Sequence, residues 1–398
     1  MSFPPVSEQL AVFRRGVVDL IDAADLEERL KRSHAEGKPL RIKFGMDPSS
    51  ADLHVGHAVQ LRKLAAIQRL GHTIVLIVGD STAMVGDPSG KNKLRPQLSR
   101  EEVEANLQTY VDQAKLVLDI EKTEVHRNSE WFDAMKFEDV LRLAGKMTVA
   151  RMLERDTFET RMEKNEPIGI HEFMYPLMQG WDSVEIDCDL ELGGTDQLFN
   201  LLVGRQLQER EEKRGQICMT MPLINGLDGR KMSKSYGNAI GLTDEPKEVF
   251  GKTMSLADDG MQTWFELLTD VDETEITTLI AGHPRDAKAR LAREICASLH
   301  GDEAATAAAE AFDRQFKSKE IPDDVPEHGW PADGEELPLP NLLKELGLAQ
   351  STSEARRLVQ QGGVKLDGEP EKDPKALVGK SRLPVLIQVG KRRFARLS

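Results

Sequence analysis

The chain has 398 residues and a net charge of -14, with 39% hydrophobic and 30% charged residues. This composition excludes a disordered chain, and the length predicts two or three domains. No apolar run approaches the ~18 residues needed to span a bilayer, which argues against a membrane protein. Three widely spaced cysteines, Cys188, Cys218 and Cys296, argue against a disulfide framework or a cysteine-based zinc site and favour a reducing, cytoplasmic location.

The first half of the chain begins with a strand–helix–strand pattern. Residues 41–47 predict a short buried strand, 57–70 carry apolar residues at helical spacing, and 73–78 form a β-branched run typical of a strand covered on both faces. This succession predicts a βαβ unit of a parallel sheet. Residues from about 100 to 165 alternate apolar and charged positions at helical spacing, which predicts helices inserted between two halves of the sheet.

The second half predicts helices, a linker and a small module. The stretch from 231 to 316 is mostly helical in pattern, whereas 317–340 is rich in proline and acids without periodicity, as in a linker. Two short helices and then short strands follow. From Pro338 to Ser398, twelve Lys and Arg stand against six Asp and Glu, a net charge of +6 that leaves -20 for the rest of the chain. A basic module on an acidic body is expected when one end contacts a polyanion.

The first chemical motif lies where the first predicted strand meets the following helix. His54-Val-Gly56-His57 stands a few residues after Asp47-Pro-Ser49. Ligands of parallel sheets bind at the carboxyl ends of strands, and helix N-termini favour anions. Two imidazoles there, with a glycine that permits close backbone approach, can donate hydrogen bonds to phosphate oxygens. Taken alone, the four residues also fit ordinary helix capping.

The second motif is a cationic loop, Lys231-Met-Ser-Lys234-Ser235, flanked by glycines. Such a loop can close on a triphosphate and stabilise the charge that develops on departing pyrophosphate. Alone, such a basic run is more often a solvated surface loop. Its position downstream of the two-histidine motif favours the functional interpretation.

The pair of motifs resembles the signature pair of class I aminoacyl-tRNA synthetases. Three further segments, in the matching order, narrow the resemblance to bacterial tyrosyl-tRNA synthetases from about Arg41 to the C-terminus. These segments are Gly86-Asp-Pro-Ser-Gly90, Tyr175-Pro-Leu-Met-Gln-Gly-Trp-Asp182 and Gly193-Gly-Thr-Asp-Gln197.

The resemblance implies an α/β fold with four parts. Residues 1–236 would form a Rossmann-like parallel-sheet catalytic domain, with a helical insertion and dimer region at about 120–180. Residues 237–316 would form an α-helical anticodon-binding domain, 317–336 a linker, and 337–398 a small α+β RNA-binding module. That module resembles the domain named after a ribosomal protein of the small subunit.

The resemblance also assigns roles to individual residues. Catalytic roles fall to His54, His57, Lys231, Lys234 and Ser235. ATP binding falls to Asp47, Ser49, Gly56, Asp196 and Lys234. Tyrosine binding falls to Asp87, Tyr175, Gln179, Asp182 and Gln197, with Asp182 accepting a hydrogen bond from the phenolic hydroxyl. Binding of tRNA falls to Arg356, Arg357, Lys391, Arg392 and Arg393.

The implied reaction activates L-tyrosine with ATP to tyrosyl-adenylate and pyrophosphate, and then transfers tyrosine to the 3′ end of tRNA(Tyr), giving AMP. The substrate carboxylate is the nucleophile, so positioning and electrostatic stabilisation are sufficient without a general base. We expect Mg²⁺ to accompany ATP without a dedicated protein metal site. We also expect a homodimer and no membrane partner.

One departure from the family pattern concerns the tyrosine pocket. Lys43 stands where the best-known members carry a tyrosine that shares recognition of the substrate hydroxyl, and Phe44 stands where a small residue often contacts ribose. A second bacterial subgroup has the same pattern, which favours a subtype over loss of function.

Two alternatives stay open. A tryptophan-specific relative would lack the Tyr175–Asp182 pattern and the basic module. A non-enzymatic RNA-binding protein on this scaffold would have lost His54, His57 or Lys234, and all three are present.

Overall fold

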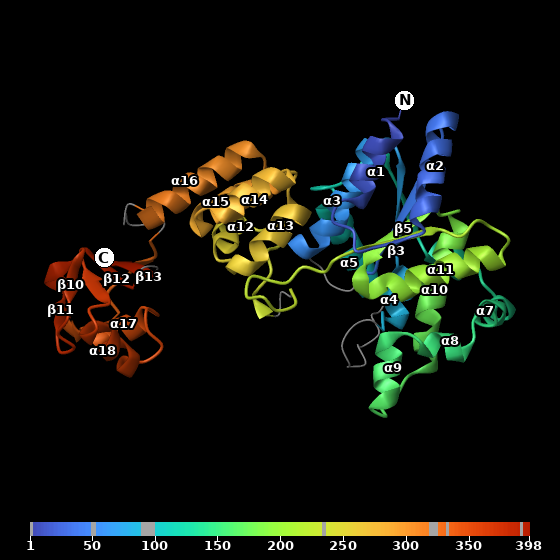
Figure 1. Cartoon of the computed structure of the whole chain (residues 1–398). Coiled ribbons are helices and arrows are strands. Elements are labelled where there is room, and N and C mark those ends of the chain that lie inside the picture. Colours follow the sequence, from blue (N-terminus) through green and yellow to red (C-terminus); the bar gives the residue numbers. More distant parts are fainter. Residues whose placement is uncertain are drawn as a thin grey trace. The chain divides into compact units, whose positions relative to one another are not determined.

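The structure is a computed structural model in which the chain forms two compact units, Met1–Ala309 and Glu310–Ser398 (Figure 1). It describes residues 3–48, 53–88, 100–232, 236–317, 325–331, 334–390 and 393–398.

The first unit is built around a six-stranded sheet with the spatial order β1-β6-β5-β2-β3-β4. Five strands run parallel, and the edge strand β1 pairs antiparallel with β6. The parallel sheet is therefore confirmed, with one correction at its edge, where a short strand can pair antiparallel without a crossover helix. The strands are β1 (Asp19–Ile21), β2 (Arg41–Met46), β3 (Thr73–Val78), β4 (Thr123–Arg127), β5 (Leu190–Gly194) and β6 (Ile217–Met221).

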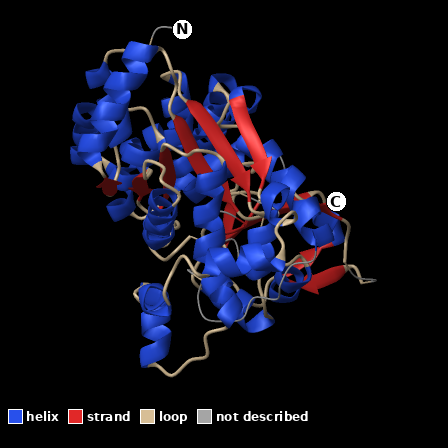
Figure 2. Cartoon of the chain, turned by 90° about the vertical axis from the view of Figure 1, so that its right-hand side faces the viewer, coloured by secondary structure: helices blue, strands red, loops and turns tan. Residues whose placement is uncertain are grey.

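Helices lie on both sides of these strands (Figure 2). Because both faces are covered, β3 and β5 are almost entirely buried and consist mainly of apolar residues. The helices and 3-10 turns up to β4 are α1 (Val6–Arg14), α2 (Ala23–Glu36), α3 (Val55–Arg69), α4 (Asp80–Val85), α5 (Arg100–Ala114) and η1 (Ile120–Lys122).

The helix α3 begins two residues earlier than the apolar spacing predicts. His54 is its N-cap, and the His54 imidazole accepts a hydrogen bond from the Gly56 N–H at 3.2 Å. The His57 imidazole in turn accepts from the His54 N–H at 3.2 Å. The two histidines therefore close a reciprocal capping box, which satisfies backbone donors that a helix start otherwise leaves unpaired.

Helices fill the chain between β4 and β5, but the helical stretch predicted from about 100 to 165 is interrupted by the strand β4, which pairs with β3. The insertion shares its apolar core with the following helices through Leu143, Met152, Leu177 and Val203. Its elements are α6 (Ser129–Phe132), α7 (Phe137–Ala144), α8 (Val149–Leu153), α9 (Asp156–Glu163) and η2 (Ile170–Phe173). Two longer helices, α10 (Met174–Glu185) and α11 (Leu198–Arg210), flank β5 and the turn η3 (Thr195–Gln197), and they pack against each other.

The remainder of the first unit is helical, which confirms the pattern predicted there. Its elements are α12 (Pro246–Met254), η5 (Asp258–Gly260), α13 (Met261–Leu268), α14 (Glu273–Ala281), α15 (Pro284–His300) and α16 (Asp302–Lys317), the last of which runs into the second unit. No helix in the described ranges is long and apolar enough to cross a membrane.

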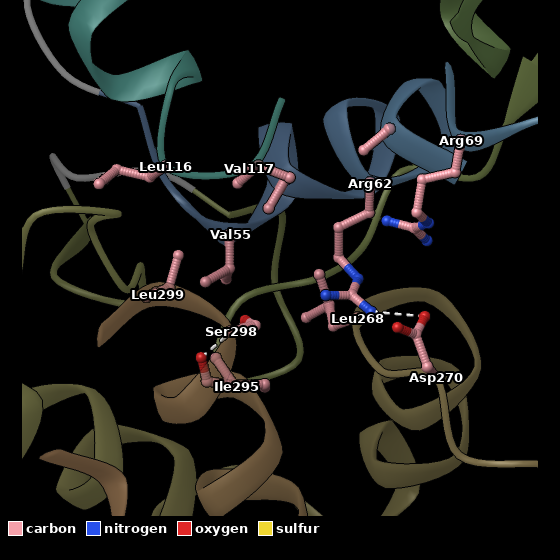
Figure 3. Close-up of a pocket in the computed structure, with 12 residues that line it drawn as sticks. Val55, Arg62, Arg69, Leu116, Val117, Leu268, Asp270, Ile295, Ser298 and Leu299 are labelled. Atoms are coloured by element: carbon pink, nitrogen blue, oxygen red, sulfur yellow. Dashed lines mark hydrogen bonds and ion pairs between the residues drawn. The ribbon is translucent and has the colours of Figure 1, made fainter. Parts of the chain in front are cut away.

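The helices α13 and α15 lie next to α3, with a cavity of about 260 Å³ between them (Figure 3). One stripe of α3 faces this cavity through Val55, Ala58, Arg62, Ala65 and Arg69. Arg62 forms an ion pair with Asp270, just after α13, at 2.8 Å. This cavity contains none of the predicted site residues, so α3 presents a structural face here and a different face to the predicted site.

The second unit contains a five-stranded sheet with the order β10-β9-β12-β13-β7 and a two-stranded ribbon of β8 and β11. Its elements are β7 (Glu327–His328), β8 (Glu336–Pro338), α17 (Leu339–Glu345), α18 (Thr352–Gln360), β9 (Val364–Leu366), β10 (Glu369–Glu371), β11 (Leu377–Gly379), η6 (Lys380–Arg382), β12 (Val385–Val389) and β13 (Arg393–Leu397). The strand β7 falls inside the segment predicted as a linker, yet it pairs with β13 and belongs to this small sheet.

Candidate active site

A cavity of about 450 Å³ opens at the carboxyl ends of β2, β3 and β5. The chain runs from β2 outward to β4 and then crosses to β5 on the other side of β2, so the cavity lies where the strand order reverses. Open parallel sheets bind their ligands at such a point. The predicted site residues that line it are Asp47, His57, Asp87, Tyr175, Gln179, Asp182, Asp196 and Gln197.

Asp47 follows β2 directly and is held from two sides. Its Oδ2 accepts a hydrogen bond from the Tyr175 hydroxyl at 2.8 Å, and its Oδ1 accepts from the Thr82 hydroxyl at 2.7 Å. Burial and the carboxylates of Asp47 and Asp87 raise the pKa of Tyr175, so its hydroxyl keeps the proton that it donates. Asp47 is thus fixed between α4 and α10.

Asp87 lies after α4 and contacts residues from two other parts of the chain. Gln197 Nε2 donates to its Oδ2 at 2.8 Å, and the buried Arg155 guanidinium contacts its Oδ1 at 3.2 Å. Arg155 stands between α8 and α9, so the inserted helices supply a cation to this edge of the cavity.

The face of α10 brings Tyr175, Gln179 and Asp182 into one cavity, since helical positions three and four apart lie on the same side. Asp182 is only 3% exposed. Its Oδ1 accepts from the Trp131 indole N–H at 3.0 Å, and the Asn128 amide lies 3.5 Å from its Oδ2. Burial raises the pKa of Asp182 to about 7, although the Lys43 charge and these two donors oppose that rise.

The amide of Gln179 is oriented by its neighbours. Asn200 donates to Gln179 Oε1 at 2.8 Å and to Gln197 Oε1 at 3.0 Å, so one amide orients two of the predicted tyrosine-binding side chains. Gln179 Nε2 donates to Glu191 at 3.1 Å. A buried polar network of this kind holds its members in fixed rotamers.

The two signature motifs meet at Gly56. A methyl group built on Gly56 would lie 2.9 Å from the His54 ring and 3.3 Å from the Met232 sulfur, so a larger residue here would displace the His54 ring. Burial and Asp87 raise the pKa of Asp196, while the Lys231 charge lowers it. The positive charge of Lys231, in the cationic loop, therefore reaches an acid that lines the cavity. Ser49, Lys234 and Ser235 lie outside the described residues.

The predicted tRNA-binding residues lie in the second unit. Arg356 and Arg357 are exposed on α18, which begins at the Ser351 N-cap. Arg393 contacts the Leu348 carbonyl and lies 3.9 Å from Glu354, so part of its hydrogen-bonding capacity is used within the unit. Lys391 and Arg392 lie outside the described residues.

Within the described ranges, no group of three or more His, Cys, Asp or Glu side chains is arranged to hold a metal ion. The three cysteines are buried and unbridged, and burial raises the pKa of each thiol.

The structure adds residues that the motifs did not indicate. Thr82 holds Asp47, Arg155 pairs with Asp87, Trp131 contacts Asp182, and Glu191 contacts Gln179. Each stands outside a recognisable motif, between 12 and 68 residues from the side chain that it contacts. Lys43, which contacts Gln179 and Glu191, is also added by the structure. It alone could have been noticed in the sequence, because it departs from the family pattern.

Comparison with known proteins gives the family of this fold. The profile described as "tRNA synthetases class I (W and Y)" matches residues 35–317, and that of the S4 domain matches 337–382. The chain belongs to this synthetase family. The family predicted from the motifs is thereby confirmed.

Relatives of this synthetase are similar over nearly their whole length. A tyrosine–tRNA ligase of Moorella thermoacetica is 50% identical over 98% of this chain and 96% of its own. One of Thermotoga maritima is 52% identical over 98% and 97%. The truncated mitochondrial tyrosyl-tRNA synthetase of Aspergillus nidulans, a solved structure, has a TM-score of 0.63, with 24% identity over 78% of this chain and 94% of its own. At that identity the solved structure supports the fold alone.

Gly79→Ala should damage the synthetase site selectively. A methyl group there would lie 2.0 Å from Asp47 Oδ1 and 2.2 Å from Thr82 Oγ1, so it would displace the carboxylate. We expect amino-acid-dependent ATP–pyrophosphate exchange to fall by roughly 10²-fold, the scale seen when one preorganised group is misplaced.

The matched control is Gly251→Ala, within α12, where a methyl group meets nothing within 4 Å. This change should leave exchange unaltered and stabilise the chain slightly. Equal exchange rates for the two variants would contradict the role given to the Asp47–Thr82 contact.

Proposed function

We propose that this chain is a tyrosine–tRNA ligase, which activates L-tyrosine with ATP and transfers it to tRNA(Tyr). The observation that carries the specificity is the Asp182 carboxylate, buried and facing a cavity of amino-acid size. A phenolic hydroxyl donates to such an acceptor, whereas the side chain of phenylalanine has no donor for it. The names of the full-length relatives support the same conclusion.

The rest of the tyrosine site handles the ammonium and carboxylate groups. The ammonium group is bound by oxygen acceptors, of which the Asp87 carboxylate is the charged one. Tyr175, Gln179 and Gln197 line the same part of the cavity. Apolar side chains such as Leu61 and Leu192 complete the cavity for the ring. A polar end and an apolar body suit a ligand with tyrosine's distribution of polarity.

Activation is an in-line displacement at the α-phosphate of ATP. The tyrosine carboxylate oxygen forms a bond to the α-phosphorus, and the bond to the bridging oxygen breaks, so that pyrophosphate leaves with the electron pair. Asp47 and Asp196 contact the nucleoside, while Ser49, His54, Gly56 and His57 approach the phosphates and ribose. Lys231, Lys234 and Ser235 stabilise the leaving group from the loop. The terminal hydroxyl of tRNA then attacks the carbonyl carbon and AMP leaves.

Magnesium enters with ATP as part of the substrate. Mg²⁺ is usually bound by substrate phosphates, water and one or two carboxylates, so the synthetase needs no dedicated protein cage. We also propose a cytoplasmic location, because three buried free thiols suit a reducing compartment.

The test of the proposed specificity is ATP–pyrophosphate exchange with each of the standard amino acids. Only tyrosine should support exchange, and phenylalanine should be at least tenfold poorer in kcat/KM, because it leaves the Asp182 acceptor without its donor. Comparable exchange with tryptophan would refute the specificity. Binding of tRNA without exchange for any amino acid would favour the non-enzymatic alternative.

In this proposal residues 337–398 form the tRNA-binding module, and residues 237–316 form an anticodon-binding helical domain. Its net charge of +6 between Pro338 and Ser398, and the exposed guanidinium groups of Arg356 and Arg357, suit contact with RNA phosphates. The S4 match over 337–382 supports it.

Arg356→Gln/Arg357→Gln should weaken tRNA charging and spare amino acid activation. We expect charging at physiological salt to fall severalfold. The salt dependence of tRNA binding should become shallower, because a complex with fewer phosphate contacts releases fewer counterions when it forms. The control Arg14→Gln/Arg32→Gln removes the same charge from exposed positions on α1 and α2. If both pairs changed charging equally, the module would have no specific role.

We further propose a homodimer formed through the inserted helices. Several large apolar side chains there are exposed, including Phe137 at 77%, Leu141 at 57% and Ile170 at 85%. Phe137 and Leu141 are one helical turn apart on α7, so they form one apolar face. An exposed apolar face of this kind is typical of an interface.

Phe137→Asp/Leu141→Asp should therefore dissociate the dimer, because two carboxylates would be buried in the interface. Sedimentation should give twice 44.4 kDa for the unmodified chain and 44.4 kDa for the variant. Leu377→Asp, at an equally exposed leucine of β11, should keep the mass of the unmodified chain. A monomeric unmodified chain at micromolar concentration would contradict the proposal.

A further inference from the structure

A fully buried ion pair lies directly beneath the helix that lines the cavity. Lys43 and Glu191 are cross-strand neighbours on β2 and β5, and both side chains are 0% exposed. Lys43 Nζ lies 2.9 Å from Glu191 Oε1. Because the register of two central strands sets this distance, the pair is part of the rigid frame of the sheet.

The pair is bonded to α10 at two successive turns. Lys43 Nζ donates to the Gln179 carbonyl at 2.6 Å and to the Ser183 hydroxyl at 2.8 Å, so with Glu191 all three ammonium protons have acceptors. Glu191 accepts from the Gln179 amide at 3.1 Å and from the Ser183 hydroxyl at 3.2 Å. Gln179 lines the cavity, and Ser183 adjoins Asp182, which also lines it.

Stability alone does not account for two charges at this depth. Removing both ions from water costs more than their attraction usually returns, and apolar residues of similar volume are often as stable or more so. The pair does, however, fix the height and rotation of α10 relative to the sheet. It thereby sets where Gln179 and Asp182 stand in the cavity.

The charge of Lys43 also acts on Asp182. The groups that act on this carboxyl are Lys43 from β2, Glu191 from β5, the Trp131 indole of α6 and the Asn128 amide just before it. Burial favours the protonated form, and Lys43 is the largest opposing influence. Glu191 pulls in the opposite direction but more weakly. Lys43 itself stays charged, because Glu191 and Asp182 raise its pKa against the effect of burial.

We propose that Lys43 is a positioning and specificity-determining residue for tyrosine: with Glu191 it anchors α10 at Gln179 and Ser183, and it places a positive charge beside Ser183, the neighbour of the Asp182 carboxyl that accepts the phenolic hydroxyl. This inference rests on the proposed tyrosine specificity. Lys43 does not line the cavity, so it acts on the substrate only through Gln179 and Asp182.

The test is the pH dependence of tyrosine activation in the double variant Lys43→Met/Glu191→Gln. The double change is used because Lys43→Met alone would leave Glu191 charged and buried without a partner. Glutamine keeps one of the two carboxylate oxygens, which can still accept from the Ser183 hydroxyl, and its NH2 group replaces the oxygen that accepted from the Gln179 amide. The measurement is kcat/KM for tyrosine in pyrophosphate exchange between about pH 6 and 9, which reports the pKa of the essential group in the free synthetase.

In the unmodified chain, kcat/KM should rise as Asp182 ionises, around pH 7. In the double variant the rise should move to higher pH, because the lost Lys43 charge acted on Asp182 more strongly than the lost Glu191 charge. A shift of about one pH unit would lower kcat/KM at pH 7 roughly fivefold, and most of this loss would be recovered near pH 9. The ratio of the two profiles removes the titration of tyrosine itself. Phenylalanine brings no hydroxyl to Asp182, so its exchange should fall by the same factor at every pH. The pH-dependent part of the loss should therefore be specific to tyrosine, and the KM for ATP should stay constant.

The control is Lys63→Met, which also removes a buried lysine of the first unit. Lys63 Nζ donates to the carbonyls of Val12, at 2.7 Å, and of Arg15, at 2.6 Å, away from α10. This variant should lose stability and keep the pH profile of the unmodified chain.

Two results would overturn the inference. An equal loss at every pH would make the pair a scaffold without influence on Asp182, and an unchanged profile would deny it any role. Failure of the unmodified chain to exchange with tyrosine is a separate result, which refutes the proposed function and removes the basis of this inference with it.

Discussion

The constraint on which the site depends is that neighbouring parallel strands end at the same edge of the sheet. β2, β3 and β5 all deliver their following residues to that edge, and the strand order reverses there. A reversal leaves no crossover helix covering the space between the two halves, so a cavity opens. Asp47, Asp87 and Asp196 come from three separated parts of the chain and meet because the sheet brings them there. The chemistry of the site is therefore a consequence of topology before it is one of individual side chains.

Much of the fold was predictable from local pattern. The buried strands at residues 41–46 and 73–78 show uninterrupted apolar or β-branched runs, and the face of α10 follows from helical spacing. The start of α3 was misplaced by two residues, because a histidine cap has no apolar period. The edge strand β1 and the two-residue β7 were missed for a similar reason: strands this short carry too few residues to display alternation.

The site was predictable where motifs and topology coincide, and unpredictable where one residue serves another from a distance. Tyr175, Gln179 and Asp182 are grouped by one helix, so sequence spacing was enough to bring them together. Arg155 reaches Asp87 from an inserted helix, and no local pattern distinguishes it from an exposed arginine. Lys43 is similar: a lysine in a strand ordinarily indicates an exposed edge or a solvated face, and only the three-dimensional structure shows its burial.

The buried pair of Lys43 and Glu191 has an evolutionary consequence. Replacing either residue alone leaves an uncompensated ion in the core, at a cost of about 3–5 kcal/mol, which is a large part of the stability of an ordinary domain. An ancestor with an uncharged residue at either position therefore faced a fitness valley between two arrangements of the pocket. We expect substitutions at the two positions to be inherited together in any lineage that carries this fold. Relatives with the charged pair and relatives with uncharged residues at both positions would then form separate branches. Few relatives should carry only one of the two charged residues.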